Sequence, residues 1–551
     1  MPHPSTLPPP PPGSDPPSAS PTESVDAAEL NPGRTARRRR IWPWLIVVPL
    51  VVAALSVLTF NWRAAARLQA ALDDLAARGE PITYAEAYAL LAANPPADDD
   101  NLAGVPLLLS MHDSEPGRAM RQQLEDDQPE LLQLWDNFEP PWFPLSGTGA
   151  SAVGQTEEDW SRWTPENLVQ WSSSAPEWIE HPDGAAATVY QMTVDLHPLI
   201  HDLAADCRDR SSVLWPKRPL EGIALLHESP GSLFTTARST SNRRTLRMVA
   251  IAAVERGDAD LAAAAIEVAT AFMRTYAGHG AAMDTLEVGS YVAVTSDLLF
   301  AGLLRRIWDE EQLARLQLAI EMTLPACDWG PYQRNERVFG LAASEHMKRH
   351  RSLGLDLNEE GGGGLMLRAL PNGFFDHHAA SSLELLDDPH LQPGAMLPAE
   401  PPRHDNMLPS WLGWLAAWDQ THLVGIAFHN VVVSLRAAET RLRLAHAAIA
   451  LKRFYLQHDR YPDQWQELIP GILDQPPLDP FTRGVLVLLP ADPAARRERP
   501  VIYSLGLNRE DNGGTQAFDP DTPTVLGDRF ATGYVVWGYP GDEPPAGPGD
   551  D

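Results

Sequence analysis

The sequence predicts a mainly α-helical protein with one transmembrane helix near its N-terminus and a small α+β domain at its C-terminus. Three observations support this fold class. Residues 41–60 form an apolar run without a charge. Between residues 185 and 330, apolar side chains recur at steps of three and four, the period of an amphipathic helix. After residue 480, short β-branched runs are separated by Pro and Gly turns, which is typical of a small sheet.

Residues 1–40 are predicted to form a disordered cytoplasmic tail. Runs of Pro with Ser and Thr leave almost no apolar surface to offset the entropy of ordering. The tail ends in an arginine run, Arg34 and Arg37 to Arg40.

Residues 41–60 are predicted to be a transmembrane signal anchor. A helix of this length matches the roughly 30 Å hydrocarbon core of a bilayer. Five arginines precede the span, and only Arg63 and Arg67 follow it closely, so the N-terminus is expected in the cytoplasm and the body in the periplasm or another extracytoplasmic space. The alternative is a cleaved secretory signal, which the long apolar core disfavours.

The composition is acidic, with 43 Lys and Arg against 73 Asp and Glu and a formal net charge of −30. Five basic and four acidic residues precede residue 41, so the rest of the chain carries 38 basic and 69 acidic side chains, a net −31. Phosphate backbones require a basic face, so nucleic acid is excluded as a partner. The same charge disfavours an anionic membrane surface as a partner for the body.

Residues 61–184 are predicted to be a helical and Trp/Pro-rich connector. Thr83 and Glu86 have the spacing of a capping box, which starts a short helix. From about residue 136 no period is sustained, and the many tryptophans there either line a sugar-binding face or pin a loop to a core.

Residues 185–410 are predicted to form an irregular stack of helical hairpins. Short joints at Arg256-Gly257-Asp258 and Trp308-Asp309-Glu310 force neighbouring helices to be antiparallel. The glycine run 361–364 is expected to be a flexible loop in an irregular stretch, 355–410. The expected helices are Ala186 to Asp206, Thr235 to Glu255, Ala259 to Tyr276, Leu286 to Ile307 and Glu310 to Leu324.

The chain has two cysteines, Cys207 and Cys327. An oxidising compartment would allow them to pair, and the sequence leaves open whether they do. Neither has the neighbouring Cys or His that a metal site requires.

Residues 411–540 are predicted to form a long helix, about 411–455, followed by the α+β tail, and residues 541–551 are expected to be disordered. Leu435, Leu442 and Ile449 recur at seven-residue spacing and define one apolar stripe of the helix.

The stretch from Phe454 to Gly514 resembles the C-terminal domain of type II secretion major pseudopilins. That family has a long helix, then Tyr-Pro, a short helix closing in Leu-x-Pro, an Asp-Pro-aromatic turn, an antiparallel sheet, Tyr-Ser-x-Gly and a glycine-rich acidic loop. The matching residues here are Tyr461, Pro462, Leu468, Pro470, Asp479, Pro480, Phe481, Tyr503, Ser504, Gly506, Gly513 and Gly514.

The resemblance implies a calcium ion in the final loop, bound by the carbonyl of Leu505, by Asn508, and by the oxygen donors Asp511 and Asp528. Asn508 stands where the family has Asp, which removes one negative charge from the expected site. The alternative is an acidic turn held by hydrogen bonds without a metal.

The chain departs from the family in its N-terminal half, because its anchor is not followed directly by the long helix of the tail. Assembly into a pilus is therefore not expected. The whole chain also resembles uncharacterised membrane-anchored envelope proteins of planctomycete-type bacteria, which implies a location but no activity.

No catalytic or cofactor-binding residue is predicted. The first hypothesis is a membrane-anchored helical scaffold that binds another envelope protein. The alternative is an envelope hydrolase with a His/Asp/Glu site around 346–378, built from His346, His350 and Asp376-His377-His378. His197 and His201 form another pair at helical spacing, and such pairs are expected by chance among 17 histidines.

Overall fold

The computed structural model divides the chain into two compact units, Met1–Phe60 and Asn61–Asp551. The structure describes residues 32–111, 114–129, 132, 185–215, 236–277, 282–350, 370–389, 421–491, 500–507, 509–511 and 536–537. The expected loops at 136–184 and 361–364, the expected tail at 541–551 and residues 1–31 of the tail expected over 1–40 lie outside these residues. The end of that tail, residues 32–40, was expected to be disordered but belongs to helix α1 (Pro32–Ala77), since its arginines favour a helix.

Helix α1 (Pro32–Ala77) begins in the first unit and ends in the second. Its part from Val47 is, among the described residues, the one helix long and apolar enough to cross a membrane. The large apolar side chains of Val47, Leu50, Leu55 and Leu58 are 45–63% exposed. The expected apolar helix near the N-terminus is therefore present.

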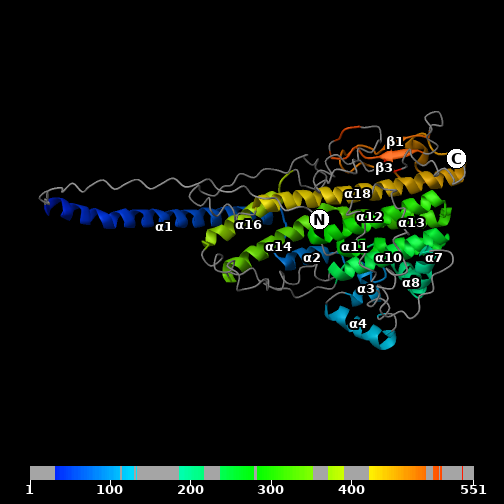
Figure 1. The fold of residues 1–551 in the computed structure, drawn as a ribbon, viewed down its shortest axis with the longest axis horizontal. Helices are drawn as coiled ribbons and strands as arrows, with labels where there is room; N and C mark the ends of the chain where they lie inside the picture. Colours follow the sequence, from blue (N-terminus) through cyan, green and yellow to red (C-terminus); the bar gives the residue numbers. More distant parts are fainter. Residues whose placement is uncertain are drawn as a thin grey trace, which may run out of the picture. The chain divides into compact units, whose positions relative to one another are not determined.

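The second unit is mainly helical, as expected (Figure 1). After α1 its described α-helices are α2 (Tyr84–Leu91), α3 (Pro106–Ser110), α4 (Glu115–Asp127), α7 (Ala185–Met192), α8 (Leu196–Arg208), α10 (Thr236–Arg256), α11 (Ala259–Ala277), α12 (Ala282–Arg305), α13 (Glu310–Thr323), α14 (Trp329–His350), α16 (Asn372–Leu386) and α18 (Thr421–His458). Short 3₁₀ turns are η1 (Leu102–Gly104), η4 (Leu324–Cys327) and η6 (Trp465–Leu468).

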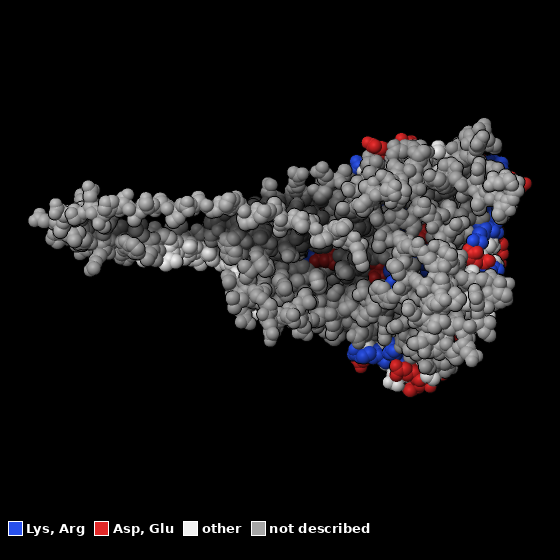
Figure 2. Space-filling model, viewed as in Figure 1, with Lys and Arg blue, Asp and Glu red and all other residues white. Residues whose placement is uncertain are grey.

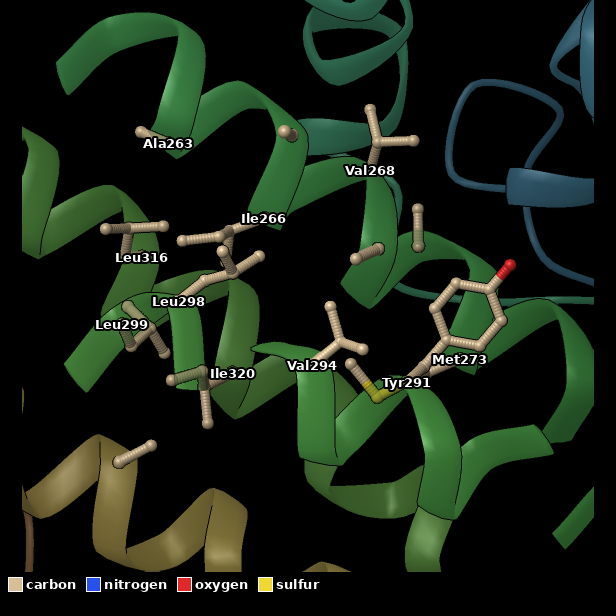
Figure 3. Close-up of a cluster of buried hydrophobic side chains, with 14 of the residues drawn as sticks. Ala263, Ile266, Val268, Met273, Tyr291, Val294, Leu298, Leu299, Leu316 and Ile320 are labelled. Carbon is tan, nitrogen blue, oxygen red and sulfur yellow. The ribbon is translucent and has the colours of Figure 1, made fainter. Parts of the chain in front are cut away.

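Helix α11 is the centre of the stack. Every side chain from Leu261 to Tyr276 is buried, and α8, α10, α12 and α13 all contact this helix. Figure 3 shows Ile266 of α11 beside side chains of α12 and α13, including Leu298 and Leu316, whereas Val268 points to another side of α11. Its alanines leave little side-chain volume, which allows neighbouring helices to approach closely.

The short joints are built by capping residues, as the sequence predicts. Gly257 has φ +74°, a conformation that favours glycine, and Asp258 Oδ1 accepts a hydrogen bond from the Leu261 amide at 3.1 Å. Asp309 and Gln312 form a capping box at the start of α13, with bonds of 2.8 and 3.0 Å. The box expected at Thr83 and Glu86 is also present. Consecutive helices therefore fold back on each other.

A buried carboxylate joins three helices of the stack. Glu267 of α11 is only 3% exposed. It accepts from Arg208 of α8 at 3.1 Å and from Arg315 of α13 at 3.0 and 3.1 Å. A buried charge is costly without such partners, so this pairing fixes how α8 and α13 lie on α11.

The tail contains the predicted antiparallel sheet, β1 (Val487–Leu489), β2 (Val501–Tyr503) and β3 (Val536–Trp537), in the order β1-β2-β3. Leu488 pairs with Ile502, and Ile502 pairs with Trp537. Phe481 and Leu507 of the tail pack in one cluster with Val432 and Leu435 of α18. The long helix therefore supports the tail as well as the stack.

Two expectations about the helices were wrong. The helix expected over 186–206 is two helices, α7 and α8, separated by a turn after Met192. Thr193 stands at this break, and its hydroxyl donates to the Val189 carbonyl at 3.1 Å. The stretch 355–410, expected to be irregular, contains the 15-residue helix α16, which is about four turns long.

Cys207 and Cys327 are both buried and free, so the disulfide that the sequence left open is not formed. Burial raises the pKa of the Cys207 thiol to about 12 and also raises the pKa of the Cys327 thiol. Neither thiol is a reactive nucleophile in the folded chain.

Gly302 of α12 provides a test of the packing between α12 and the joint before α13. A Cβ at this position would lie 2.2 Å from the Trp308 indole, whereas a Cβ at Gly289, in the same helix, would meet nothing within 4 Å. We expect Gly302→Ala to destabilise the second unit by about 1–3 kcal/mol through overpacking. Gly289→Ala should be neutral or stabilise by up to about 1 kcal/mol.

The measurement is thermal unfolding of the full chain in detergent, followed by circular dichroism. Equal melting temperatures for the two variants would contradict the placement of Trp308 over Gly302.

Candidate functional site

The structure brings the candidate residues of 346–378 into contact with the C-terminal part of α1. We call residues 61–80 the anchor foot, because they follow the apolar run directly. The foot lies along α16: Gly373 donates from its amide to Asn61 Oδ1 at 2.8 Å. A Cβ at Gly373 would lie 2.5 Å from Asn61 Cα, so this close approach requires glycine.

Arg67 provides the second contact between the foot and α16. Its Nε donates to Glu384 Oε1 at 2.6 Å, and Nη1 lies 3.1 Å from His377 Nδ1 and 3.2 Å from Ser381 Oγ. The three partners stand at positions 377, 381 and 384, which is one face of the helix. A single guanidinium therefore holds two turns of α16.

The third contact is an ion-pair network at the far end of α16. Asp387 pairs with Arg78 of the foot and with Arg337 of α14. Arg337 is only 3% exposed and also pairs with Glu80 at 3.3 Å. The foot, α14 and the end of α16 are therefore joined through one buried guanidinium, Arg337, whose carboxylate partners are partly exposed. A buried charge is costly unless such partners are in place.

The histidines of this region do not converge on a metal. His346 and His350 stack on each other with ring centroids 4.5 Å apart, and His377 faces the Arg67 guanidinium. Asp376, which the sequence left in a loop, lies on α16 and binds Lys348 Nζ at 2.7 Å. Within the described ranges, no group of three or more His, Cys, Asp or Glu could hold a metal ion.

His197 and His201 are also not a metal pair within the described part of the chain. His197 packs edge-on against Tyr190 at 4.6 Å, and burial lowers its pKa. Tyr190 donates to Asp258 Oδ2 at 2.6 Å, which together with burial raises the pKa of Tyr190 to about 12. The hydrogen bond between Tyr190 and Asp258 therefore connects α7 to the joint before α11.

In the tail, the buried carboxylate of Asp479 connects two sequence motifs. One is its own Asp-Pro-Phe turn, and the other is the Tyr-Ser-Leu-Gly segment at 503–506. Asp479 Oδ1 accepts from the Phe481 amide at 3.0 Å and from Ser504 Oγ at 2.9 Å. Its Oδ2 accepts from the Leu505 amide at 3.1 Å. Asp479 and Ser504 are each 1% exposed. The carboxylate thus closes its own turn and fixes the segment after β2 against it.

Of the four expected calcium ligands, Leu505 and Asp511 lie among the described residues, and Asn508 and Asp528 lie outside them. Leu505 and Asp511 follow the same strand, β2, and Asp511 Oδ1 accepts from the Tyr503 hydroxyl at 2.8 Å. A carbonyl and a carboxylate are oxygen donors, which suit a hard cation such as Ca²⁺. The two described residues of the expected site, Leu505 and Asp511, therefore offer the type of ligand atom that calcium prefers.

The sequence identified Asp479 as part of a motif but not as the residue that joins two motifs. The available signal was the Asp-Pro-x order, in which the Asp side chain accepts from the amide two residues later. The roles of Arg67 and Arg337 had no signal in the sequence, because their partners are distant along the chain. His377 is 310 positions from Arg67, and Asp387 is 50 positions from Arg337.

Asp479→Asn is expected to loosen the segment after β2. The side-chain nitrogen of Asn, which replaces one carboxylate oxygen, cannot accept the hydrogen bond from the Leu505 amide or from the Ser504 hydroxyl. A buried donor left without an acceptor reduces stability by about 1–3 kcal/mol. Hydrogen exchange of residues 501–507 should therefore become about 5- to 150-fold faster in the variant.

Asp474→Asn is the matched control, because Asp474 is an exposed carboxylate of the same tail. Exchange of the Leu505 amide at the wild-type rate in Asp479→Asn would show that this carboxylate does not hold the turn.

Comparison with protein-family models finds none that matches this chain, and comparisons with curated proteins and with solved structures find no match either.

Proposed function

We propose that this protein is a single-pass, membrane-anchored scaffold of the cell envelope. In this proposal its helical body lies outside the cytoplasm, carries a pseudopilin-like tail, and binds another envelope protein. The observation that carries the proposal is the exposure of the apolar run on α1. Seven large apolar side chains between Val47 and Leu58 are exposed to at least 45%. Contiguous apolar surface of this kind requires a membrane or a partner to cover it.

The build of the second unit supports a scaffold rather than an enzyme. Its buried or half-buried charged groups, such as Glu267, Arg337 and Asp479, pair with groups on other elements of the fold. Of the histidines proposed for a hydrolase, His346 and His350 stack on each other and His377 contacts Arg67. Such contacts fix the relative positions of helices, and this is what a scaffold requires.

The anchor can be tested by adding charge to the run. Arginine at the centre of a membrane helix costs about 2.5–3.5 kcal/mol on insertion scales. We expect the double variant Leu50→Arg/Val51→Arg to be released from membranes by alkaline carbonate, whereas wild type and Leu50→Ile/Val51→Ile stay in the pellet. The readout is an immunoblot of both fractions.

Orientation follows from the arginine run. A periplasm-dependent reporter fused after residue 551 should be active, and the same reporter fused before residue 1 should be inactive. Replacement of Arg34 and Arg37 to Arg40 by Gln should raise the inverted fraction. An active N-terminal reporter in the wild-type fusion would refute an extracytoplasmic body.

Calcium binding by Leu505, Asn508, Asp511 and Asp528 is part of the proposal for the tail. We expect calcium to raise the melting temperature of the full chain in detergent relative to chelator, since a ligand at 100 times its Kd stabilises by about 2.7 kcal/mol. Asp511→Asn should reduce the shift, and Asp463→Asn, an exposed carboxylate outside the turn, should retain it. Identical melting curves with calcium and with chelator would exclude the metal.

A further inference from the structure

Helix α18 connects two parts of the second unit. Val432 and Val433 in its N-terminal half lie in one apolar cluster with Tyr332 of α14 and Leu385 of α16, the two helices that bind the foot. The tail packs on the same half of α18 through Phe481. We call the contact of α18 with α14 and α16 the α18 seam. It lies between the helices that hold the foot and the helix that carries the tail.

A buried histidine belongs to the face of α18 that forms this seam. His429 stands three and four positions before Val432 and Val433, so the three side chains share one face of the helix. His429 is only 4% exposed, and its Nδ1 has no hydrogen-bond partner among the described residues. An imidazolium at this position would therefore carry a buried N–H group that donates to nothing.

The charged side chains around the seam have partners of their own. They are Arg436 on α18, Asp328, Arg337 and Lys348 on or just before α14, and Asp376, Glu384 and Asp387 on or just after α16. Burial is the cause that lowers the pKa of His429, and no described carboxylate offsets it.

The surface of the protein offers a different environment to a charge. In the view of Figure 2, acidic and basic side chains of the described residues lie beside one another. A charge there keeps its water and has an opposite charge nearby, whereas a charge on His429 would have neither. The seam is therefore a place where one added proton is unfavourable.

We propose that the α18 seam is acid-sensitive, and that protonation of His429 loosens the packing of α18 on α14 and α16. The proton binds more readily once the seam opens, because the imidazolium then reaches water. Opening would release α14 and α16, with the foot that they hold, from the helix that carries the tail. The seam requires neither the membrane nor the calcium ion of the proposed function.

The direction of the pH dependence follows from the burial of the imidazole. A histidine of the unfolded chain has a pKa of about 6.5, and burial makes the pKa of His429 lower than this in the closed seam. The closed seam is therefore most stable above about pH 6.5 and loses stability as the pH falls below that value. One pH unit below it allows a change of at most about tenfold in the opening equilibrium.

The test measures opening through a cysteine placed inside the seam, in the full chain in detergent. Val433 is 3% exposed, so the thiol of Val433→Cys is labelled only when the seam opens, whereas Asn430→Cys is exposed on the same helix. Dithiodipyridine labels both, and mass spectrometry separates these sites from Cys207 and Cys327. The ratio of the two rates reports the opening equilibrium, because intrinsic thiol reactivity cancels. We expect this ratio to rise about two- to tenfold from about pH 7.5 to about pH 5.5.

Variants of four histidines identify the group that binds the proton. His429→Leu and His429→Gln are neutral at both pH values, and each should remove the rise in the ratio, whatever its effect on overall stability. His458→Gln changes an exposed histidine of the same helix and should retain the rise. His346 and His377 are the buried histidines of α14 and α16, and their replacement by Gln should retain it as well.

A labelling ratio that is the same at both pH values in the wild-type background would overturn the acid-sensitive seam. A rise that persists in both His429 variants would overturn the assignment to His429. Neither outcome bears on the anchor or on calcium, which are measured by carbonate extraction and by thermal unfolding.

Discussion

The fold depends on the complete burial of α11. A helix that is apolar or small on all its faces has no stable position at a surface, so it must be surrounded. Four helices of the same chain, α8, α10, α12 and α13, contact α11. The joints at Gly257 and Asp309 are short enough to impose this arrangement locally. The remaining helices add to a core that already exists.

Buried charge has a consistent role both on α11 and elsewhere in the second unit. Glu267 and Arg337 each bind groups from two other segments, and Asp479 binds its own turn and the segment after β2. Taking a charge out of water costs several kcal/mol unless its partners are in place. Misplaced helices would leave these groups unpaired, so the three sites contribute more to the uniqueness of the arrangement than to its net stability.

Much of the helical architecture could be predicted because its signals are local. Apolar periodicity found α10, α11, α12 and α13, and capping residues found the start of α2. Prediction failed where local signals compete or are weak. The break after Met192 lies within an unbroken apolar period, and α16 was missed because Asp, His and Pro around it resemble a loop. The contacts of Arg67 and Asp479 depend on tertiary proximity, which a single sequence does not contain. In the tail, the order of the motifs can be seen in the sequence, but the carboxylate that joins them, Asp479, is identified only by the structure.

The two unpaired thiols have a consequence for biogenesis. A domain whose cysteines are buried and unpaired does not require a thiol oxidase or a disulfide isomerase in order to fold. Its covalent structure is the same in a reducing and in an oxidising compartment. Its folded state is also insensitive to reductant and to peroxide that cannot reach the sulfur atoms. The body can therefore reach the same covalent form in a reducing or in an oxidising compartment.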